Sequence, residues 1–306
     1  MPNISSKLVV TAALAAAAAA ISACTGPAAH TAAPAPVAIS PTTASVQHVK
    51  TPPDWTDVSG GGVVVMDNSS VPTQYGASPQ PGRVILSGYE PGSGWGFCTL
   101  GSAIRRVDGG RDGFLTAGHC GESDPSQRLQ ASATLAGPAT TVILGDVSDA
   151  QHDVIDPATS TLSDSAAVWS GATDSASVRI AGTWPVAGVM TLDAIKKLPM
   201  GTSVCYNGAR SGVKCGPLVN GDENGQLEFL GLSQKGDSGS PVFLVDKNTG
   251  AATLVGILQG GDKAGSTFAT YLEPALTRLH AVALVDPTAS AFASGPDYST
   301  RVAPLQ

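Results

Sequence analysis

The sequence predicts an all-β protein, and three observations support this prediction. Charged residues make up only 13% of the 306 residues, whereas glycine is abundant, with 36 residues. Short runs rich in Val, Ile, Thr and Ser recur along the chain, and turns rich in Gly, Asp and Asn separate them. The apolar content of 42% is sufficient for a packed core. Many short strands at such spacing are typical of a β-barrel or a β-sandwich.

Strands are expected wherever an apolar or β-branched run is bounded by turn residues. The turn Asp108-Gly109-Gly110 separates two of these runs. A final amphipathic stretch predicts the one convincing helix, from about Pro274 to Leu284. The expected strands cover residues 61–66, 83–89, 97–107, 112–120, 140–147, 165–170, 177–182, 202–208, 213–219, 227–232, 240–245 and 252–260.

Residues 1–23 have the features of an export signal. Lys7 supplies a positive charge, and the apolar stretch from Leu8 to Ala20 is too short for a comfortable membrane span. The Ile-Ser-Ala-Cys sequence that ends at Cys24 resembles the lipobox of bacterial lipoproteins, although that family usually has leucine at the position of Ile21. The resemblance implies a lipid on Cys24 and attachment to the outer face of the cell membrane. The alternative is that the export signal is cleaved nearby without lipid attachment and the protein is freely secreted.

The cysteine count agrees with a lipid on Cys24. The chain has five cysteines, and an odd number in an exported protein leaves one thiol to be explained. The other four can form two disulfides, which are chemically reasonable after export. The pairs nearest in sequence are Cys98 with Cys120 and Cys205 with Cys215, and each is expected to join the ends of a β-hairpin.

Shifts in composition predict the domain organisation. Residues 24–53 are rich in Ala, Pro and Thr and are expected to form a spacer, because they bury too little apolar surface to fold. A small propeptide is the alternative. Residues 54–82 lead into a domain that covers 83–286, and the segment 287–306 is expected to be a disordered or loosely docked tail.

Two motifs suggest nucleophilic catalysis. Residues 116–120 read Thr-Ala-Gly-His-Cys and contain His119, and residues 236–242 read Gly-Asp-Ser-Gly-Ser-Pro-Val and contain Ser238. A serine hydroxyl needs a base that takes its proton during attack, and histidine suits this role because its unperturbed pKa of about 6.5 is close to neutral pH. A buried carboxylate must then fix the imidazole tautomer.

Both motifs resemble those of chymotrypsin-fold serine peptidases and occur in that family's order. The hairpin 203–216, the strand 255–261 and the four paired cysteines narrow the resemblance to the bacterial streptogrisin and α-lytic type, over about residues 83–284. The resemblance implies two six-stranded antiparallel β-barrels with a short C-terminal helix. It also implies a serine endopeptidase that acts on peptides or proteins, with Ser238 as nucleophile and His119 as general base.

The same resemblance assigns further residues of the site. The backbone N–H groups of Gly236 and Ser238 match the oxyanion hole, which stabilises the negative charge that develops on the carbonyl oxygen. Substrate is expected to bind along Gln259, Gly260 and Gly261. Leu232, Ser233 and Lys235 are expected to wall the specificity pocket. No acidic residue stands at the expected pocket floor, so small or apolar side chains are the expected preference.

The third member of the triad has several candidates. The family places its aspartate just before a buried strand, and Asp164 and Asp174 each precede such a run. Asp164 is favoured because Ala-Ala-Val-Trp is the more apolar run, and Asp153 is a further candidate. The other aspartates between the two motifs are expected to cap turns.

Position 206 departs from the family pattern. The bacterial enzymes usually carry an arginine directly after the first cysteine of the hairpin 203–216, where it pairs with the aspartate of the serine motif. Here that position is Tyr206, and the aspartate is Asp237. Arg210 or Lys235 is then the expected partner of Asp237.

Other classes of function fit the sequence less well. The net charge of −7 and the lack of a basic run argue against a nucleic-acid partner. An α/β-hydrolase esterase requires Gly-x-Ser-x-Gly and the order Ser, Asp, His, but residue 240 is serine and the order here is His, Asp, Ser. No catalytic metal or cofactor is expected, because the five histidines are scattered and the chain contains no His-Glu-x-x-His motif. The remaining alternative is a catalytically weak cell-surface binding protein on the same fold. In either case a monomer is expected.

Overall fold

The computed structural model describes residues 52–62, 74–90, 94–121, 126–130 and 141–306. The expected export signal, Cys24 and the spacer up to residue 51 lie outside these residues, as does most of the strand expected at 61–66. Every feature below belongs to the unit Thr51–Gln306. Within the described ranges, no helix is long and apolar enough to cross a membrane.

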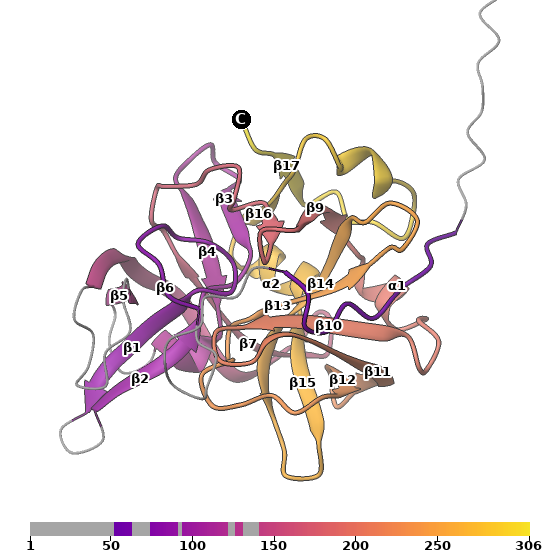
Figure 1. The fold of residues 1–306 in the computed structure, drawn as a ribbon, viewed down its shortest axis with the longest axis horizontal. Helices are drawn as coiled ribbons and strands as arrows, with labels where there is room; N and C mark the ends of the chain where they lie inside the picture. The colour runs from indigo at the N-terminus through magenta and orange to yellow at the C-terminus, as the bar shows by residue number, and fades with distance from the viewer. Residues whose placement is uncertain (1–51, 63–73, 91–93, 122–125, 131–140) are drawn as a thin grey trace, which may run out of the picture. The chain divides into compact units, whose positions relative to one another are not determined.

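Seven strands build the first barrel (Figure 1). They pair in the order β3-β4-β7-β6-β5-β1-β2. Strands β2 and β3 are two halves of one segment that bends at residues 100–102. The bend closes the barrel, because the Leu100 N–H donates to the Arg83 carbonyl at 2.8 Å and the Gly101 N–H donates to the Leu115 carbonyl at 2.7 Å. The bounds are β1 (Val84–Glu90), β2 (Gly94–Thr99), β3 (Ala103–Arg106), β4 (Asp112–Thr116), β5 (Ser126–Gln130), β6 (Thr141–Asp156) and β7 (Thr161–Val168).

Six strands close the second barrel completely. They pair antiparallel in the order β13-β10-β11-β12-β15-β14, and β14 pairs again with β13. Because β2 and β3 act as one strand, each barrel has six strands, and the predicted double barrel is confirmed. The bounds are β10 (Ser203–Gly208), β11 (Gly212–Glu223), β12 (Gln226–Leu230), β13 (Pro241–Val245), β14 (Ala252–Gly261) and β15 (Ser266–Tyr271).

Three short elements connect the barrels. Strand β8 (Arg179–Ile180) pairs with β9 (Trp184–Val189), and β9 lies parallel to β14. The single-turn helix α1 (Leu192–Ile195) follows, and its first turn is capped by the Thr191 hydroxyl, which accepts from the Ala194 N–H. The sequence did not predict β9 or α1, because both are short and lack strong periodicity.

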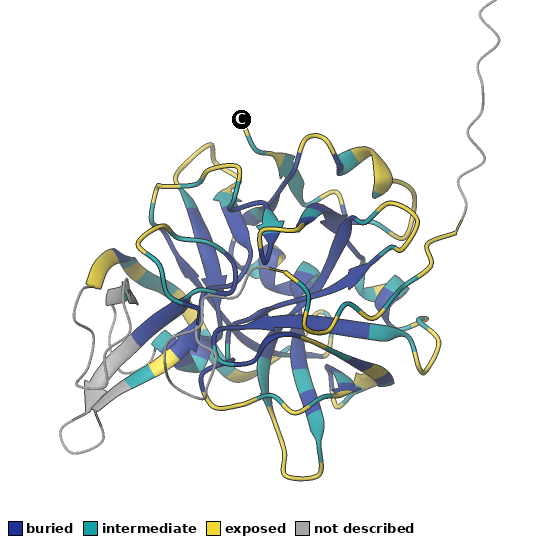
Figure 2. Cartoon of the chain, viewed as in Figure 1, coloured by how far each residue is buried: buried dark blue, intermediate teal, exposed yellow. Residues whose placement is uncertain are grey.

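The cores fill both barrels and the space between them (Figure 2). The first barrel buries Ile85 and Phe114, and the second buries Tyr206 and Phe229. A third cluster, which includes Phe243, joins β13 and β14 of the second barrel to β3, β4 and the helix α2. Each fully buried Phe or Leu stabilises the fold by roughly 1.5–3 kcal/mol. This third cluster therefore packs the two barrels against each other.

The C-terminal helix is shorter than predicted. Helix α2 (Leu272–Arg278) ends before His280, whose φ is +49°, and β16 (Ala281–Val285) follows. The expectation that the helix reaches Leu284 was wrong. Short apolar runs fit a buried strand as well as a helix, and β3 offers a free edge on which β16 pairs.

The C-terminal tail is part of the fold, whereas a disordered or loosely docked tail was expected. Strand β17 (Val302–Pro304) pairs parallel with β16, and the Ser299 N–H donates to the Val189 carbonyl at 2.8 Å. The short 3-10 turn η2 (Ser290–Phe292) precedes it. Asp286 anchors the start of the tail through Thr288 and through Arg179, whose Nη2 lies 2.9 Å from Oδ2.

Candidate active site

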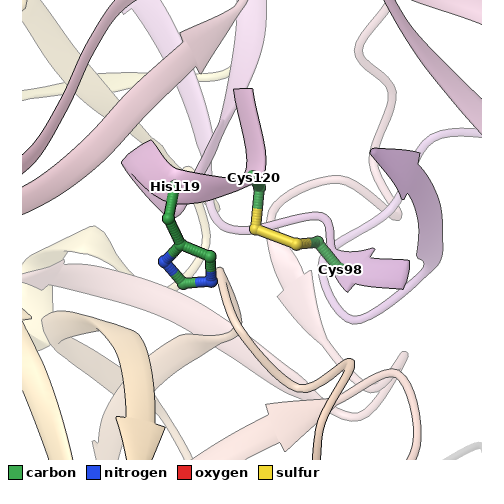
Figure 3. Close-up of side chains that lie close together, drawn as sticks. All are labelled: Cys98, His119 and Cys120. Atoms are coloured by element: carbon green, nitrogen blue, oxygen red, sulfur yellow. A yellow bond between two sulfur atoms is a disulfide. The ribbon is translucent and has the colours of Figure 1, made fainter. Parts of the chain in front are cut away.

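His119 lies on a short turn that a disulfide fixes to the neighbouring strand. The turn is the 3-10 segment η1 (Gly118–Gly121), which directly follows β4. Figure 3 shows His119 beside the bond from Cys120 to Cys98 on β2. Gly118 allows η1 to approach β6 closely, because an added Cβ would lie 1.8 Å from the Gln151 carbonyl oxygen.

Both predicted disulfides are present, but they differ in kind. Cys205 and Cys215 are direct cross-strand partners on β10 and β11, as expected for a hairpin. Cys98–Cys120 joins β2 to the turn after β4, so it does not close a single hairpin. Its position fixes the turn that carries His119.

Asp164 holds His119 at two points. Its Oδ2 lies 2.8 Å from Nδ1 of the ring, and its Oδ1 accepts from the backbone N–H of His119 at 2.9 Å. Asp164 is fully buried on β7, and its own N–H donates to the Thr270 hydroxyl at 3.0 Å. A buried carboxylate on Nδ1 keeps the proton there, so the lone pair is on Nε2.

The other candidate carboxylates lie elsewhere. Asp174 is exposed and caps its own turn, where its Oδ1 accepts from the N–H groups of Ala176 and Ser177. Asp153 lies near the site, but it contacts His152 and Gln259. Of the three candidates left open by the sequence, Asp164 is the one that the structure places on His119.

Asp237 braces the loop that carries Ser238. Its Oδ1 accepts from the N–H groups of Arg210 and Ser211, both at 3.0 Å, and its Oδ2 accepts from the Ser211 hydroxyl at 2.5 Å and the Gln234 N–H at 2.8 Å. The expected partnership with the side chain of Arg210 or Lys235 was therefore wrong. Backbone donors and one hydroxyl surround the buried carboxylate instead, so no arginine is needed at position 206.

Tyr206 takes a different role from the arginine of the bacterial enzymes. Its ring is buried in the second barrel, and its hydroxyl donates to the Leu232 carbonyl at 3.2 Å. Burial raises the pKa of Tyr206, and the nearby charge of Asp237 raises it further, so the phenol stays a neutral donor. Tyr206 therefore holds the segment that precedes the serine loop.

Thr99 fixes the serine loop to the first barrel. Its N–H donates to the Ser238 carbonyl at 2.7 Å, and its hydroxyl donates to the Gly236 carbonyl at 2.8 Å. The same hydroxyl accepts from the Ala209 N–H at 3.0 Å. The sequence did not point to Thr99, because no motif marks a threonine whose role depends on contacts between the two barrels.

The backbone around Ser238 presents two N–H groups. Gly236 has φ +105°, a conformation that favours glycine. Within the part of the chain that the structure describes, the N–H groups of Gly236 and Ser238 donate no hydrogen bond to the protein. Two such donors on one loop are what a developing oxyanion requires.

The Ser238 hydroxyl donates to the backbone carbonyl of Gln259 at 3.1 Å. The Gln259 side chain is held from both barrels, because its Oε1 accepts from Gln226 on β12 and its Nε2 donates to Asp153 on β6 at 3.1 Å. The motifs of His119 and Ser238 are adjacent, since the Cys120 sulfur lies 4.0 Å from the Ser238 carbonyl oxygen.

The residues expected to bind substrate lie side by side. An added Cβ at Gly261 would lie 2.6 Å from the Ser233 hydroxyl oxygen, whereas the space around Gly260 is open. Leu232 is 77% exposed, so its side chain is available for contact. The end of β14 and the segment before the serine loop thus run next to each other beside Ser238.

Comparisons with known proteins give only distant structural likenesses. No family model matches the sequence, and no curated protein matches it. Among solved structures, a glutamic acid-specific serine protease is 19% identical, covers 66% of this chain and 98% of its own, and has a TM-score of 0.43. Nocardiopsis protease is 19% identical, with coverage of 67% and 98% and a TM-score of 0.42. Cellulomonas bogoriensis chymotrypsin is 20% identical, with coverage of 68% and 100% and a TM-score of 0.42. At these scores the likeness adds no argument to the strand pairing and site geometry described above.

Proposed function

We propose that the protein is an exported serine endopeptidase in which Ser238, His119 and Asp164 form a catalytic triad. The observation that carries the proposal is the pair of hydrogen bonds that Asp164 accepts from the ring and the backbone N–H of His119, next to a serine loop with two N–H groups available to an oxyanion. A buried carboxylate on Nδ1 of a half-exposed histidine is the arrangement that a general base needs.

The reaction follows from these positions. The Ser238 hydroxyl oxygen attacks the carbonyl carbon of a peptide bond, while Nε2 of His119 takes the hydroxyl proton. The N–H groups of Gly236 and Ser238 stabilise the oxyanion of the tetrahedral intermediate. His119 then gives its proton to the leaving amine, which leaves an acyl-enzyme. Water attacks the ester in the second half, again with His119 as base, and Ser238 is restored.

Ser238 must change its hydrogen bond before attack. In this structure its hydroxyl proton points to the Gln259 carbonyl. Rotation about the Cα–Cβ bond turns the hydroxyl toward His119, at the cost of one neutral hydrogen bond of about 1 kcal/mol. Catalytic hydrogen bonds often form fully only when substrate is bound.

The expected preference for small or apolar side chains belongs to this proposal. The residues expected beside the specificity pocket offer no carboxylate that would attract Lys or Arg. They are the exposed Leu232, Ser233 with its hydroxyl, and Gly260, around which the space is open. Attachment through a lipid on Cys24, to the outer face of the cell membrane, is also proposed, with free secretion as the alternative.

A fluorophosphonate probe tests the proposal against a binding protein that lacks turnover. The probe reacts only with an activated serine, so wild type should be labelled at Ser238, as located by peptide mass mapping. Ser238→Ala and His119→Ala should not be labelled. Ser211→Ala is the specificity control. Ser211 is a buried serine that contacts Asp237, and it should not be the labelled residue, so Ser211→Ala should still be labelled at Ser238. Absence of labelling in folded wild type would favour the binding protein.

A further inference from the structure

Two histidine rings lie side by side at the edge of the site. His152 is on β6, and its ring centroid lies 5.4 Å from that of His119, with the ring planes inclined by 56°. The side chains of His119 and His152 are 30% and 33% exposed, so solvent reaches both. The two histidines lie far apart in the sequence, and only the fold brings β6 and η1 together.

A bulged segment of β6 carries His152. The pairing of β6 with β7 shifts register between Ser148 and Gln151 and again between Gln151 and Val154. Arg278 on α2 holds this segment, since its guanidinium donates to the carbonyl oxygens of Asp149 at 2.5 Å and of Ser165 at 2.8 Å. The position of His152 is therefore set by the fold and not by a loose loop.

Each ring has a carboxylate on one nitrogen. Asp164 lies 2.8 Å from Nδ1 of His119, and Asp153 Oδ2 lies 3.2 Å from Nε2 of His152. Histidines that bind a metal almost always donate their other ring N–H to such a partner, which orients the ring and makes the ligand more basic.

The spacing suits a transition-metal ion. One nitrogen of each ring and a carboxylate oxygen of Asp164 all lie within 4.8 Å of one another. Two imidazoles on one tetrahedral zinc place their ring centroids roughly 5 Å apart, given Zn–N bonds of about 2.0–2.1 Å. Cys98 and Cys120 also lie near His119, but as a disulfide they offer no thiolate.

We propose that His119 and His152 together bind Zn²⁺ or a similar divalent transition-metal ion, with water as the remaining ligands. His119 binds through Nε2, because Asp164 occupies its Nδ1. The metal is an inhibitor and not a cofactor, because it takes the lone pair that would accept the serine proton. This inhibition rests on the proposed peptidase function, whereas the binding of the metal does not.

Calorimetric titration with ZnCl₂ tests the binding without reference to activity. Wild type and Ser238→Ala should both bind one ion, since neither lacks a ligand. His152→Gln should weaken binding by at least about tenfold. The matched control is His280→Asn, which removes an exposed histidine at a φ of +49° that asparagine tolerates, and it should leave binding unchanged. No binding to wild type, or equal binding to His152→Gln, would overturn the proposal.

A kinetic measurement tests the inhibition. ZnCl₂ should inhibit peptide hydrolysis by wild type, EDTA should reverse the effect, and the half-inhibitory concentration should rise at least about tenfold in His152→Gln, relative to that variant's own zinc-free rate. Equal inhibition of both proteins would contradict the site.

A second variant covers the case in which His152→Gln does not fold. Asp153→Asn keeps both ligands and should weaken zinc binding by about tenfold. Unchanged zinc binding in Asp153→Asn would count against the proposal. If wild type hydrolyses no peptide, the proposed function fails, while the calorimetry still decides the metal site.

Discussion

Asp164 contacts His119 through both carboxylate oxygens, one on the ring and one on the backbone N–H of the same residue. The second contact fixes the turn η1 as well as the ring. The position and the tautomer of His119 therefore depend on one buried side chain, and the Cys98–Cys120 disulfide holds the same turn through the residue next to His119.

Asp164→Asn should lower kcat/KM for peptide hydrolysis by roughly 10⁴-fold. The amide keeps the shape and can still accept from the backbone N–H of His119. Its NH₂ group, however, donates to Nδ1 and moves the ring proton to Nε2, where it blocks acceptance of the serine proton. Steady-state kinetics on a peptide substrate measure the loss.

Asp174→Asn is the matched control for this change. Asp174 caps an exposed turn, so the kinetics should stay within about twofold of wild type. If Asp174→Asn were inactive and Asp164→Asn active, the assignment of the triad carboxylate would have to move to Asp174.

Thr99→Val should impair both stability and turnover. The variant keeps the shape but leaves the buried Gly236 carbonyl and Ala209 N–H without their hydroxyl partner, at a cost of about 1–3 kcal/mol. Because Gly236 belongs to the loop of the proposed oxyanion hole, kcat should fall more than KM rises. Thermal unfolding and steady-state kinetics check the two effects.

The control for Thr99→Val is Thr277→Val on the exposed side of α2. It removes a hydroxyl that bonds the Glu273 carbonyl at 3.0 Å, but water replaces that bond, so the change in stability should stay within about 0.5 kcal/mol. If Thr99→Val kept the wild-type melting temperature and kcat, the bracing role of Thr99 would be refuted.

Stability should fall in acid partly through Asp112. Burial raises the pKa of Asp112, but hydrogen bonds from Arg105 and Thr173 and the charge of Arg105 outweigh it and hold the pKa below the ordinary value of 3.8. The unfolded chain therefore binds the proton first as pH falls. The stabilisation is fully present above the ordinary value and is lost as pH drops through the lowered pKa.

A series of melting temperatures between neutral pH and the lowest pH at which the protein still folds checks this prediction. Asp112→Asn should be less stable than wild type at neutral pH and should show a shallower decline in acid. Asp108→Asn is the control, because Asp108 is an exposed residue whose Oδ2 lies 3.5 Å from Nε of Arg106. A parallel decline of wild type and Asp112→Asn would contradict the linkage.

Local patterns in the sequence predicted an all-β fold, and the spacing of the cysteines predicted both disulfides. The double barrel was implied by the resemblance that the motifs of His119 and Ser238 carry. The sequence did not predict β16, since Ala281–Val285 is too short to distinguish strand from helix without the edge of β3 on which it pairs. The docked tail depends likewise on contacts with β9 and β16.

The residues that support the site could not be identified from the sequence, for a related physical reason. Thr99 and Ser211 act through contacts between segments that are apart in the sequence, and no motif surrounds either residue. His152 likewise lies beside His119 only in the fold. Gln259 was expected to bind substrate, but its link to Asp153 and Gln226 appears only in three dimensions. The partner of Asp237 was misassigned because a carboxylate can be satisfied by backbone N–H groups, which every sequence contains.

Cys24→Ser should release the protein from the membrane without changing catalysis. If Cys24 carries lipid, wild type should enter the detergent phase in a phase-separation assay, because each buried CH₂ contributes about 0.8 kcal/mol. Cys24→Ser removes the thiol and should leave the protein unlipidated, with kcat/KM unchanged because Cys24 lies outside the unit Thr51–Gln306. Soluble wild type with a mature N-terminus beyond Cys24 and no lipid mass would contradict the anchor and leave the peptidase proposal untouched.

Hydrolysis of a peptide library by wild type and by Ser238→Ala tests the central claim most directly. Wild type should cleave internal peptide bonds, preferentially after small or apolar residues. Ser238→Ala should fall to the level of background at an unchanged melting temperature, because only the attacking oxygen is lost. His119→Ala should be about as damaging, since members of a triad act as a unit. If folded Ser238→Ala cleaved the library as fast as wild type, Ser238 would not be the nucleophile and the account would be contradicted.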